Sequence, residues 1–318
     1  MESPSPAAAP AAACRVAVCA LTLGRPVGLG SLLAGLARLE VPPDTDVVVV
    51  IVDNDPAGSA RAVVDTWRPR LPFDVSFVVE PRRGIPFARN TAVAAAGAAD
   101  FVAFIDDDEV PDPRWLAELI RVQRATGSAV VAGPVVPRFE EPPSPWIVAG
   151  GFFEKRRFAD GGPAPFATTS SVLIARRAFP SGIPPFNEKM ALTGGTDTHF
   201  FMRAQLQGHD ISWADKAPVT ETIPASRANL RWLLRRQYRR GLVLTMSMLD
   251  LRGSPVRRLR RVLNGLLNLT QGLALVVLGV GRGRITLVRG LQRLWFGAGL
   301  LAGLAGARYE EYRTIHGR

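Results

Sequence analysis

The sequence predicts an α/β protein with a doubly wound, mostly parallel sheet, followed by a C-terminal helical tail. Between residues 14 and 108, short runs rich in Val, Ile and Phe alternate with stretches of helical spacing. Strands and helices in this rhythm form a parallel sheet with helices on both faces. From about residue 229 the pattern changes to long basic and apolar stretches that are typical of helices.

Four segments are expected to form the sheet, and they are residues 15–23, 46–53, 73–80 and 100–108. The middle ones are apolar enough to be buried on both faces, as strands of a parallel sheet are. Helices are expected at residues 28–40, 57–68 and 86–97, and the last of these is alanine-rich and suited to close packing on a sheet. Ligands of such sheets bind beyond the carboxyl ends of the strands, so residues that end a strand are the first candidates for a site.

Negative charge is concentrated where the fourth strand ends, at residues 106–109, in a chain with a formal net charge of +11. Asp53 ends the second strand, so both groups are expected at the same rim of the sheet. Consecutive carboxylates repel one another, and a divalent cation would relieve that repulsion. Asp106 and Asp108 can turn their oxygens to the same side, and hard oxygen ligands suit Mg²⁺ or Mn²⁺. In the competing interpretation Asp112 caps the next helix, but this leaves the three consecutive aspartates unexplained.

The overall composition restricts the class of protein further. Lys and Arg outnumber Asp and Glu by 39 to 28, which favours an anionic partner or a solvated basic surface. Cys14 and Cys19 are too few for a disulfide framework or a structural zinc site, and a reducing compartment fits them. Residues 1–13 are rich in Ala and Pro and lack a basic n-region, so we expect a disordered tail that is not cleaved.

The second half of the chain begins with residues 134–166, a Pro- and Gly-rich segment. It is too long for an ordinary connection and is expected to be a functional or ordered surface excursion. Strand character returns at residues 167–179, helical spacing follows at residues 196–207, and two short strands are expected within residues 209–221.

The C-terminal region combines basic and apolar stretches. Residues 229–241 and 255–263 are expected to form basic helices, and residues 262–281 carry no charge. A helix of that uncharged length could reach across roughly 30 Å of hydrocarbon, although it contains several Asn, Thr and Gln side chains. A second apolar stretch covers residues 294–307. We expect a helical hairpin in or on a membrane that turns at residues 281–284, with two buried helices of a soluble domain as the alternative.

A resemblance to a known family is carried by three stretches: VVVVIVDND, RRGIPFARNTAVAAAGAADFVAFIDDDEVPDPRWL and GGTDTHFFMR. Together they resemble the family 2 glycosyltransferases, and most closely the subgroup of succinoglycan-biosynthesis-type enzymes that build bacterial exopolysaccharides. The resemblance covers about residues 14–240 and implies the GT-A fold, a nucleotide-sugar donor and an inverting, metal-dependent transfer. The expected organisation is therefore a tail (1–13), a transferase domain (14–240) and a membrane-associated helical region (241–318).

The resemblance also implies roles for single residues. In the family pattern Asp53 holds the nucleoside, and Asp106 and Asp108 contact the ribose and the metal that bridges the diphosphate. Similar enzymes place an arginine-bearing segment near the site, which corresponds here to residues 234–241. There either Arg235 with Arg239 or Arg236 with Arg240 could meet the diphosphate, or the helix could rest on anionic lipid. The expected donor-binding residues are Thr22, Arg25, Asp53, Arg89, Asn90, Asp106 and Arg236, and the expected metal ligands are Asp106, Asp108 and Glu221.

Inversion in one step requires a base that deprotonates the acceptor hydroxyl on the far side of the sugar. Asp197 is the candidate for this catalytic residue, because the preceding glycines let the backbone approach a sugar and the following helix positions the side chain. Similar enzymes often carry Glu-Asp at this point, whereas this chain has Thr196 before Asp197, so an acceptor contact made by Glu is missing. The alternative is that Asp197 only caps the helix.

These observations favour an inverting glycosyltransferase that moves a sugar from a nucleotide-diphosphate donor to a glycan or lipid-linked glycan at the cytoplasmic face of the cell membrane. A sugar-nucleotide nucleotidyltransferase is the first alternative, but residues 21–30 are a poor version of its glycine-rich phosphate loop. The same stretch also argues against a dinucleotide oxidoreductase, because it lacks the third glycine of the dinucleotide-binding motif. A non-catalytic basic membrane adaptor remains compatible with the charge, whereas no nucleic acid is expected because no aromatic platform interleaves the basic residues.

Overall fold

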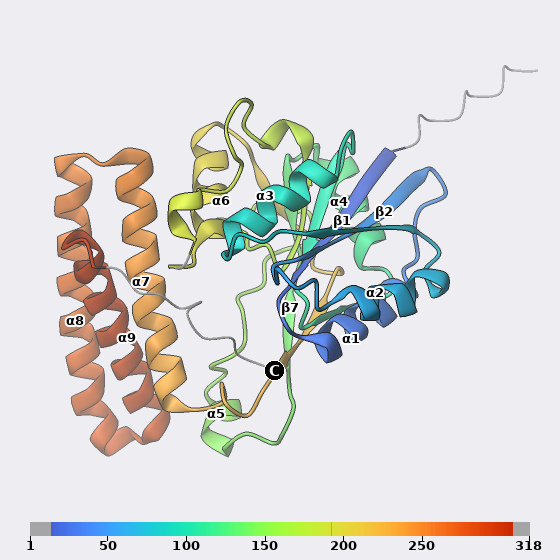
Figure 1. Cartoon of the computed structure of the whole chain (residues 1–318). Helices are drawn as coiled ribbons and strands as arrows, with labels where there is room; N and C mark the ends of the chain where they lie inside the picture. Colours follow the sequence, from blue (N-terminus) through green and yellow to red (C-terminus); the bar gives the residue numbers. More distant parts are fainter. Residues whose placement is uncertain (1–13, 192, 308–318) are drawn as a thin grey trace, which may run out of the picture.

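The computed structural model describes residues 14–191 and 193–307 and shows a layered α/β domain with a layer of long helices on one side (Figure 1). Within the described residues the main sheet has seven strands in the order β3-β2-β1-β4-β8-β6-β9. Its strands are β1 (Cys14–Thr22), β2 (Thr45–Asp53), β3 (Asp74–Val79), β4 (Phe101–Ile105), β6 (Val130–Ala132), β8 (Ser171–Ala175) and β9 (Ile211–Trp213). The predicted α/β class and the four predicted N-terminal strands are confirmed.

Strand direction and register bring the strand ends to one rim. The strands β1, β2, β3 and β4 are parallel neighbours, and the pairing places Thr22 opposite Asp53 at the end of β1 and β2. Strand β8 runs antiparallel to both β4 and β6, so the sheet is mostly but not wholly parallel. The carboxyl ends of β1, β2 and β4 therefore share the edge at which the acidic residues were expected.

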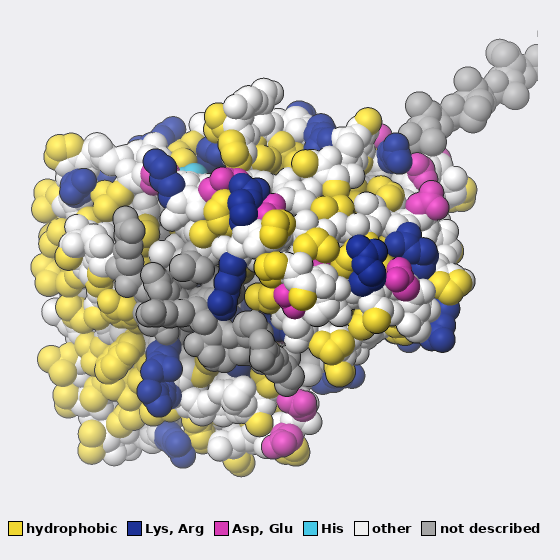
Figure 2. Space-filling model, viewed as in Figure 1, with side chains coloured by type: hydrophobic (Ala, Val, Ile, Leu, Met, Phe, Trp, Pro, Cys, Tyr) yellow, Lys and Arg dark blue, Asp and Glu magenta, His cyan; other side chains and the backbone are white. Residues whose placement is uncertain are grey.

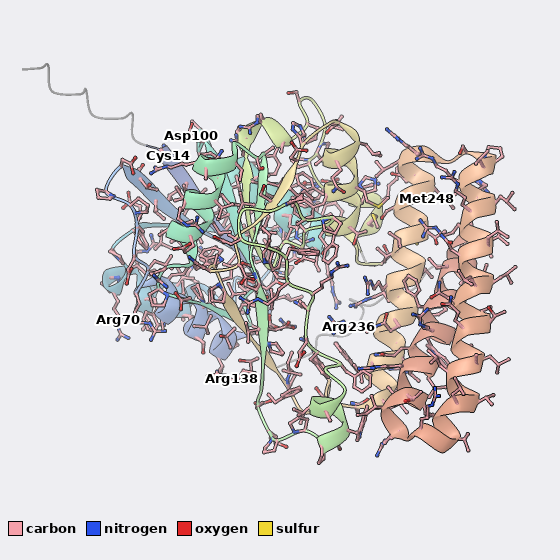
Figure 3. The ribbon with its side chains drawn as sticks, turned by 180° about the vertical axis from the view of Figure 1, so that it is seen from behind. Cys14, Arg70, Asp100, Arg138, Arg236 and Met248 are labelled. Atoms are coloured by element: carbon pink, nitrogen blue, oxygen red, sulfur yellow. The ribbon has the colours of Figure 1, made fainter. Side chains whose placement is uncertain are left out.

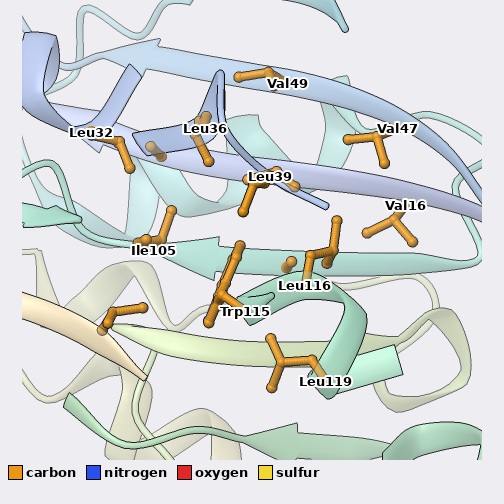
Figure 4. Packing of buried hydrophobic residues seen from close by; sticks show 14 of the residues in the cluster. Val16, Leu32, Leu36, Leu39, Val47, Val49, Ile105, Trp115, Leu116 and Leu119 are labelled. Carbon is orange, nitrogen blue, oxygen red and sulfur yellow. The ribbon is translucent and has the colours of Figure 1, made fainter. Parts of the chain in front are cut away.

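Helices cover both faces of this sheet, as the alternating pattern predicts. On one face lie α1 (Pro26–Leu36), α2 (Arg61–Trp67) and α4 (Trp115–Thr126), and Figure 4 shows Leu36, Ile105 and Trp115 in the apolar core that they enclose. On the other face lie α3 (Ile85–Ala95) and α6 (Thr196–Leu206). Short helices are found at α5 (Pro145–Ala149), η1 (Arg68–Arg70), η2 (Arg176–Ala178) and η3 (Glu188–Met190).

A second, three-stranded sheet crosses the rim of the first. It contains β5 (Glu109–Pro111), β10 (Val219–Ile223) and β7 (Val135–Phe139) in the order β5-β10-β7. Strand β5 continues directly from the acidic run, and antiparallel pairing places Glu221 of β10 opposite Glu109. The second sheet therefore carries a residue from late in the chain to the acidic run, although the two are far apart in the sequence.

Three long helices form the C-terminal layer: α7 (Leu230–Arg252), α8 (Pro255–Arg282) and α9 (Arg284–Leu304). Helix α9 packs against both α7 and α8 (Figure 1). The chain turns between α8 and α9 at Gly283, whose φ of 94° suits glycine, so the hairpin expected around residues 281–284 is present. Helix α7 continues through the expected domain boundary after residue 240.

Glycines allow these helix backbones to approach one another closely. Gly265, Gly272 and Gly279 of α8 are buried against α9, where a Cβ atom would meet backbone or side-chain atoms of that helix at 2.6 to 2.8 Å. On the other side of α9, a Cβ at Gly299 would lie 2.1 Å from the carbonyl oxygen of Tyr238 in α7. The three helices are therefore joined as one tightly packed layer.

Alanine substitution should test this packing. Gly272→Ala and Gly299→Ala are each expected to lower the free energy of unfolding by about 1–3 kcal/mol, because the added methyl group overpacks a closed interface. Gly281→Ala is the matched control, since a Cβ there would meet no atom within 4 Å. Thermal unfolding followed by circular dichroism would measure the difference, and an equal loss of stability in all three variants would contradict the packing argument.

Candidate active site

A cavity of about 320 Å³ opens at the rim where β1, β2 and β4 end, between the sheet and helix α7. Most of the predicted site residues line it, namely Thr22, Arg25, Arg89, Asp106, Asp108, Glu221 and Arg236. Arg239, one of the arginines considered for the diphosphate, also lines it, and so do residues that were not predicted, among them Asn54, Asp107, Lys155, Arg227 and Trp232. The predicted residues Asp53, Asn90 and Asp197 are not part of its lining.

The loop after β1 holds the acidic run in place. Thr22 donates a hydrogen bond from its hydroxyl to Oδ2 of Asp107 at 2.8 Å, and the Arg25 guanidinium contacts Asp107 at 2.9 Å and Asp108 at 3.2 Å. Burial raises the pKa of Asp107 to about 6, although Arg25 opposes this rise. Helix α1 can approach the backbone of the acidic run because Gly28 has no Cβ, which would lie 2.7 Å from the Asp107 carbonyl oxygen.

The expected metal ligands lie together with basic side chains that pair with them. Asp108 contacts Arg25 and, at 3.5 Å, Arg227. Glu221 contacts Lys155 at 3.3 Å and Arg227 at 3.7 Å, so Arg227 bridges the two carboxylates. Mixed charges of this kind compensate one another when no ligand is bound.

Asp106 lies at the centre of this charge network. Its carboxylate accepts a hydrogen bond from the Ser170 hydroxyl at 3.2 Å, and its backbone N–H donates to Glu109 at 3.0 Å. Burial, followed by the charges of Asp108 and Glu221, raises its pKa, whereas Arg89 and Lys155 lower it. The carboxylates therefore act on one another electrostatically, and additional positive charge between them would be stabilising.

The side chains that line the cavity can be compared with those that a divalent metal ion requires. Hard carboxylate oxygens are the ligands that Mg²⁺ and Mn²⁺ prefer, and Asp106, Asp108 and Glu221 line one cavity, so the chemistry of the donor set fits. Across residues 14–191 and 193–307, however, no three His, Cys, Asp or Glu side chains are already arranged to hold a metal ion. The assignment of these three residues as ligands stays a prediction.

Asp53 is fully buried behind the rim. Its two carboxylate oxygens accept the backbone N–H groups of Asp55 at 3.0 Å and Ala60 at 2.8 Å, and this fixes the turn after β2. Asn54 lines the cavity instead, and its side chain accepts the backbone N–H of Gly84 at 2.9 Å. A direct contact of Asp53 with a nucleoside stays a prediction, while its contacts in this structure support the loop.

The side chains of the neighbouring residues Arg89 and Asn90 of α3 have different surroundings, and only Arg89 lines the cavity. Arg89 is buried, lines the cavity and donates to the hydroxyls of Thr169 and Thr196. Asn90 exchanges hydrogen bonds with the backbone of Phe186 at 3.0 and 2.8 Å and does not line the cavity. Arg89 thus connects the cavity to the first residue of α6, next to Asp197.

Asp197 occupies the first turn of α6 and is half-buried. Its carboxylate accepts the N–H of the next residue, Thr198, at 2.7 Å. The preceding Gly195 has a φ of 79°, and a Cβ there would lie 1.9 Å from Val243 of α7. The glycine therefore permits a close approach of α7 to this loop, whereas the approach of a sugar to the same backbone stays a prediction.

Helix α7 presents one face to the cavity. Trp232, Arg236 and Arg239 line it, and the Arg236 guanidinium lies over the Trp232 ring at 5.2 Å from its centroid. Figure 3 shows Arg236 between the helical layer and the α/β domain. Burial lowers the pKa of Arg236, and nearby arginines lower it further, so an anion beside it would be stabilising. The cavity combines Arg236 with Arg239, one arginine from each of the two alternative pairs that the spacing predicted, whereas Arg235 and Arg240 are exposed.

Sequence reasoning missed residues whose partners are distant in the chain. Lys155 comes from the Pro- and Gly-rich excursion, where only its length indicated a function. Arg227 lies in the turn before α7, and nothing in its local pattern pointed to the acidic run. Asp107 was visible within that run, but its neighbours Asp106 and Asp108 were preferred because of their spacing.

Comparison with known proteins identifies the family and the fold. The family model described as "Glycosyl transferase family 2" matches residues 21–182. The succinoglycan biosynthesis protein ExoM of Rhizobium meliloti (strain 1021) is 35% identical over 213 residues, which cover 67% of this chain and 69% of that protein.

Solved structures with a similar fold include S. aureus TarS, with a TM-score of 0.52, 16% identity and coverage of 87% of this chain but only 55% of the TarS chain. TarS 1–349 in complex with UDP has the same score and identity, and there the coverage is 96% of this chain and 95% of the other. At this identity the likeness concerns the GT-A-like fold alone. Because the family model matches about half of the chain and the ExoM relative is 35% identical over 67% of it, the chain belongs to glycosyltransferase family 2.

Proposed function

We propose that this chain transfers a sugar, with inversion, from a nucleotide-diphosphate donor to a glycan or lipid-linked glycan acceptor in cell-surface polysaccharide synthesis. The observation that carries the proposal is that Asp106, Asp108 and Glu221 line the same cavity as Arg236 and Arg239. Carboxylates and arginines together suit a diphosphate and its counter-cation. The presence of UDP on TarS and the role of ExoM in succinoglycan biosynthesis support the choice of donor and product.

In this proposal the donor diphosphate lies between the acidic run and the face of α7 that carries Arg236. Mg²⁺ or Mn²⁺, held by Asp106 and Asp108 with Glu221 as a third ligand, would stabilise negative charge on the departing diphosphate. Arg236 and Arg239 donate hydrogen bonds to phosphate oxygens. The positive charge of the two guanidinium groups favours breakage of the bond between the anomeric carbon and the phosphate oxygen.

The acceptor is activated by Asp197. Its carboxylate takes the proton of the acceptor hydroxyl while the hydroxyl oxygen forms a bond to the anomeric carbon, and the nucleoside diphosphate leaves from the opposite face. One displacement of this kind inverts the anomeric configuration. Arg89, which contacts Thr196, holds the start of α6 against the donor cavity and so fixes the place of the base relative to the donor.

Nucleotide binding tests the proposed donor. A panel of nucleoside diphosphates and nucleotide sugars, each with and without Mg²⁺ or Mn²⁺, is expected to raise the thermal unfolding temperature most when nucleotide and metal are both present. NAD, the control, should leave the unfolding temperature unchanged. Release of pyrophosphate from a nucleoside triphosphate and a sugar 1-phosphate would instead identify the alternative, a nucleotidyltransferase, and would overturn the transfer reaction.

We place the acceptor and the enzyme at the cytoplasmic face of the cell membrane. Among the described residues one helix, Pro255–Arg282, is long and apolar enough to cross a membrane by length and composition. Arginines lie at both of its ends. Nucleotide sugars are available in the cytoplasm, so a lipid-linked acceptor presented on that face can meet the donor there.

A further inference from the structure

Helix α8 has a long apolar surface that no described part of the chain covers. We call it the α8 face, and it consists of Leu259, Leu263, Leu266, Leu267, Leu273, Val277, Leu278 and Val280. Their exposed fractions range from 44% to 81%. Figure 2 shows hydrophobic side chains gathered along the side of the molecule where α8 lies.

The position of the α8 face follows from the helical packing. Gly265, Gly272 and Gly279 are spaced by seven residues and point into α9, so the opposite side of α8 must point away from the protein. That side is lined mainly by Leu and Val over about six helical turns. An apolar surface of this length on a folded domain, interrupted only near the exposed Thr270 and Gln271, indicates contact with another apolar phase.

The charges around the α8 face indicate the chemistry of its partner. Arg257, Arg258, Arg260 and Arg261 precede the uncharged run and Arg282 and Arg284 follow it, and no Asp or Glu occurs between residues 251 and 307. A second copy of this chain would bring arginines together with no acidic residue of this region to pair with them. Anionic lipid head groups provide the missing negative charge, and acyl chains accept the Leu and Val side chains.

The connections of α8 determine its orientation. It packs on α9, α9 packs on α7, and the Thr245 hydroxyl of α7 donates to the Leu300 carbonyl oxygen of α9 at 3.1 Å. Helix α7 in turn lines the cavity with Trp232 and Arg236. A crossing by α8 would therefore carry the arginine-rich helix α7 towards the hydrocarbon, at a high cost in free energy.

We infer that α8 lies in the plane of an anionic membrane surface, with the α8 face among the acyl chains and the arginines at both helix ends beside the head groups. Both ends of the helix stay on the same side of the bilayer. This inference rests on the proposed membrane location and makes it specific, but its test uses lipid vesicles without any sugar transfer. A failure here would therefore leave the proposed reaction standing.

Vesicle flotation tests the α8 face. Full-length protein is expected to float with vesicles of phosphatidylcholine and phosphatidylglycerol and to float much less with phosphatidylcholine alone. The triple variant Leu266→Gln, Leu273→Gln and Val277→Gln should bind anionic vesicles at least roughly tenfold more weakly, since three apolar side chains no longer enter the lipid. The control replaces Val136, Val148 and Ile183 by Gln, which are exposed apolar residues outside α8, and should bind as the unchanged protein does.

Two results would contradict the proposal that a membrane covers the α8 face. One is equal flotation of the α8 triple variant and the unchanged protein. The other is a dimer of the full-length protein in size-exclusion chromatography that the triple variant converts to a monomer, without vesicle binding by either. In that case a second copy of the chain covers the α8 face.

Labelling from one side tests the orientation. In a Cys14→Ser background, single cysteines in place of Arg258 and Arg282, which are exposed and lie outside the α8 face, mark the two ends of α8, while the remaining Cys19 is buried. With the protein added to preformed vesicles, a membrane-impermeant maleimide outside is expected to label both positions. Labelling of only one end, with the other end becoming reactive after detergent is added, would show a crossing and overturn the in-plane arrangement.

Discussion

Asp108→Asn is expected to lower kcat/KM for sugar transfer by at least roughly 10³-fold, because a divalent cation held by this carboxylate would supply several kcal/mol of charge stabilisation. The side chain lines the cavity and contacts Arg25 and Arg227 at 3.2 and 3.5 Å, so it lies where cations and phosphates would meet. Asn has nearly the same shape and should keep the fold. Steady-state transfer assays with Mg²⁺ or Mn²⁺ measure the effect, and circular dichroism checks the fold.

The control for this variant is Asp112→Asn in the same stretch. Asp112 accepts the backbone N–H of Arg114 at 3.0 Å and is not part of the cavity lining, so its replacement should leave transfer nearly unchanged. A second measurement separates metal binding from general electrostatics. The metal-dependent part of the nucleoside diphosphate's thermal protection should disappear in Asp108→Asn, and full metal-dependent turnover in that variant would show the ligand assignment to be wrong.

Asp197→Asn is expected to lower kcat by roughly 10²-fold or more while donor binding changes little, which is typical of losing a general base. Asn keeps the size of the side chain and its contact with the Thr198 N–H, but it cannot take the acceptor proton. We expect kcat to fall without a change in donor affinity, because Asp197 does not line the cavity in which the donor is proposed to bind. Transfer kinetics together with nucleotide titration give both quantities.

Asp210→Asn is the matched control, since Asp210 is exposed just beyond the other end of α6. It should change neither kcat nor donor affinity. If Asp197→Asn instead weakened donor binding at an unchanged kcat, Asp197 would be a binding residue, and the base would have to be sought elsewhere in the site.

Much of the fold could be predicted because local patterns determine it. The apolar runs before Asp53 and Asp106 are strands buried on both faces, and their alternation with helices requires a parallel sheet whose rim gathers these residues. The antiparallel strand β8 and the sheet formed by β5, β10 and β7 could not be predicted in the same way. Their pairing depends on contacts between segments that are distant in sequence.

The candidate site shows the same limit at the level of single residues. The position of Asp53 at a strand end was correct, but its buried carboxylate accepts N–H groups of the following turn, which only the folded loop brings to it. The arginines of α7 were paired by helical spacing, whereas the face that meets the cavity is determined by the packing of α7 on α9. That packing places Gly299 against Tyr238, and this contact cannot be predicted from the sequence around either residue.

Helix α7 serves both as a wall of the cavity at the candidate site and as the support of the helical hairpin. If the protein binds a membrane through the α8 face, the donor diphosphate would therefore lie at a fixed distance from the membrane surface. The helices α8, α9 and α7 would set this distance, because they pack one on the next and the axes of packed helices are roughly 8–10 Å apart. The reacting sugar of a lipid-linked acceptor would have to lie at the same distance from the membrane. Sugars too close to the lipid or too far from it would not reach Asp197, so the thickness of the helical layer would select acceptors by the length of their glycan.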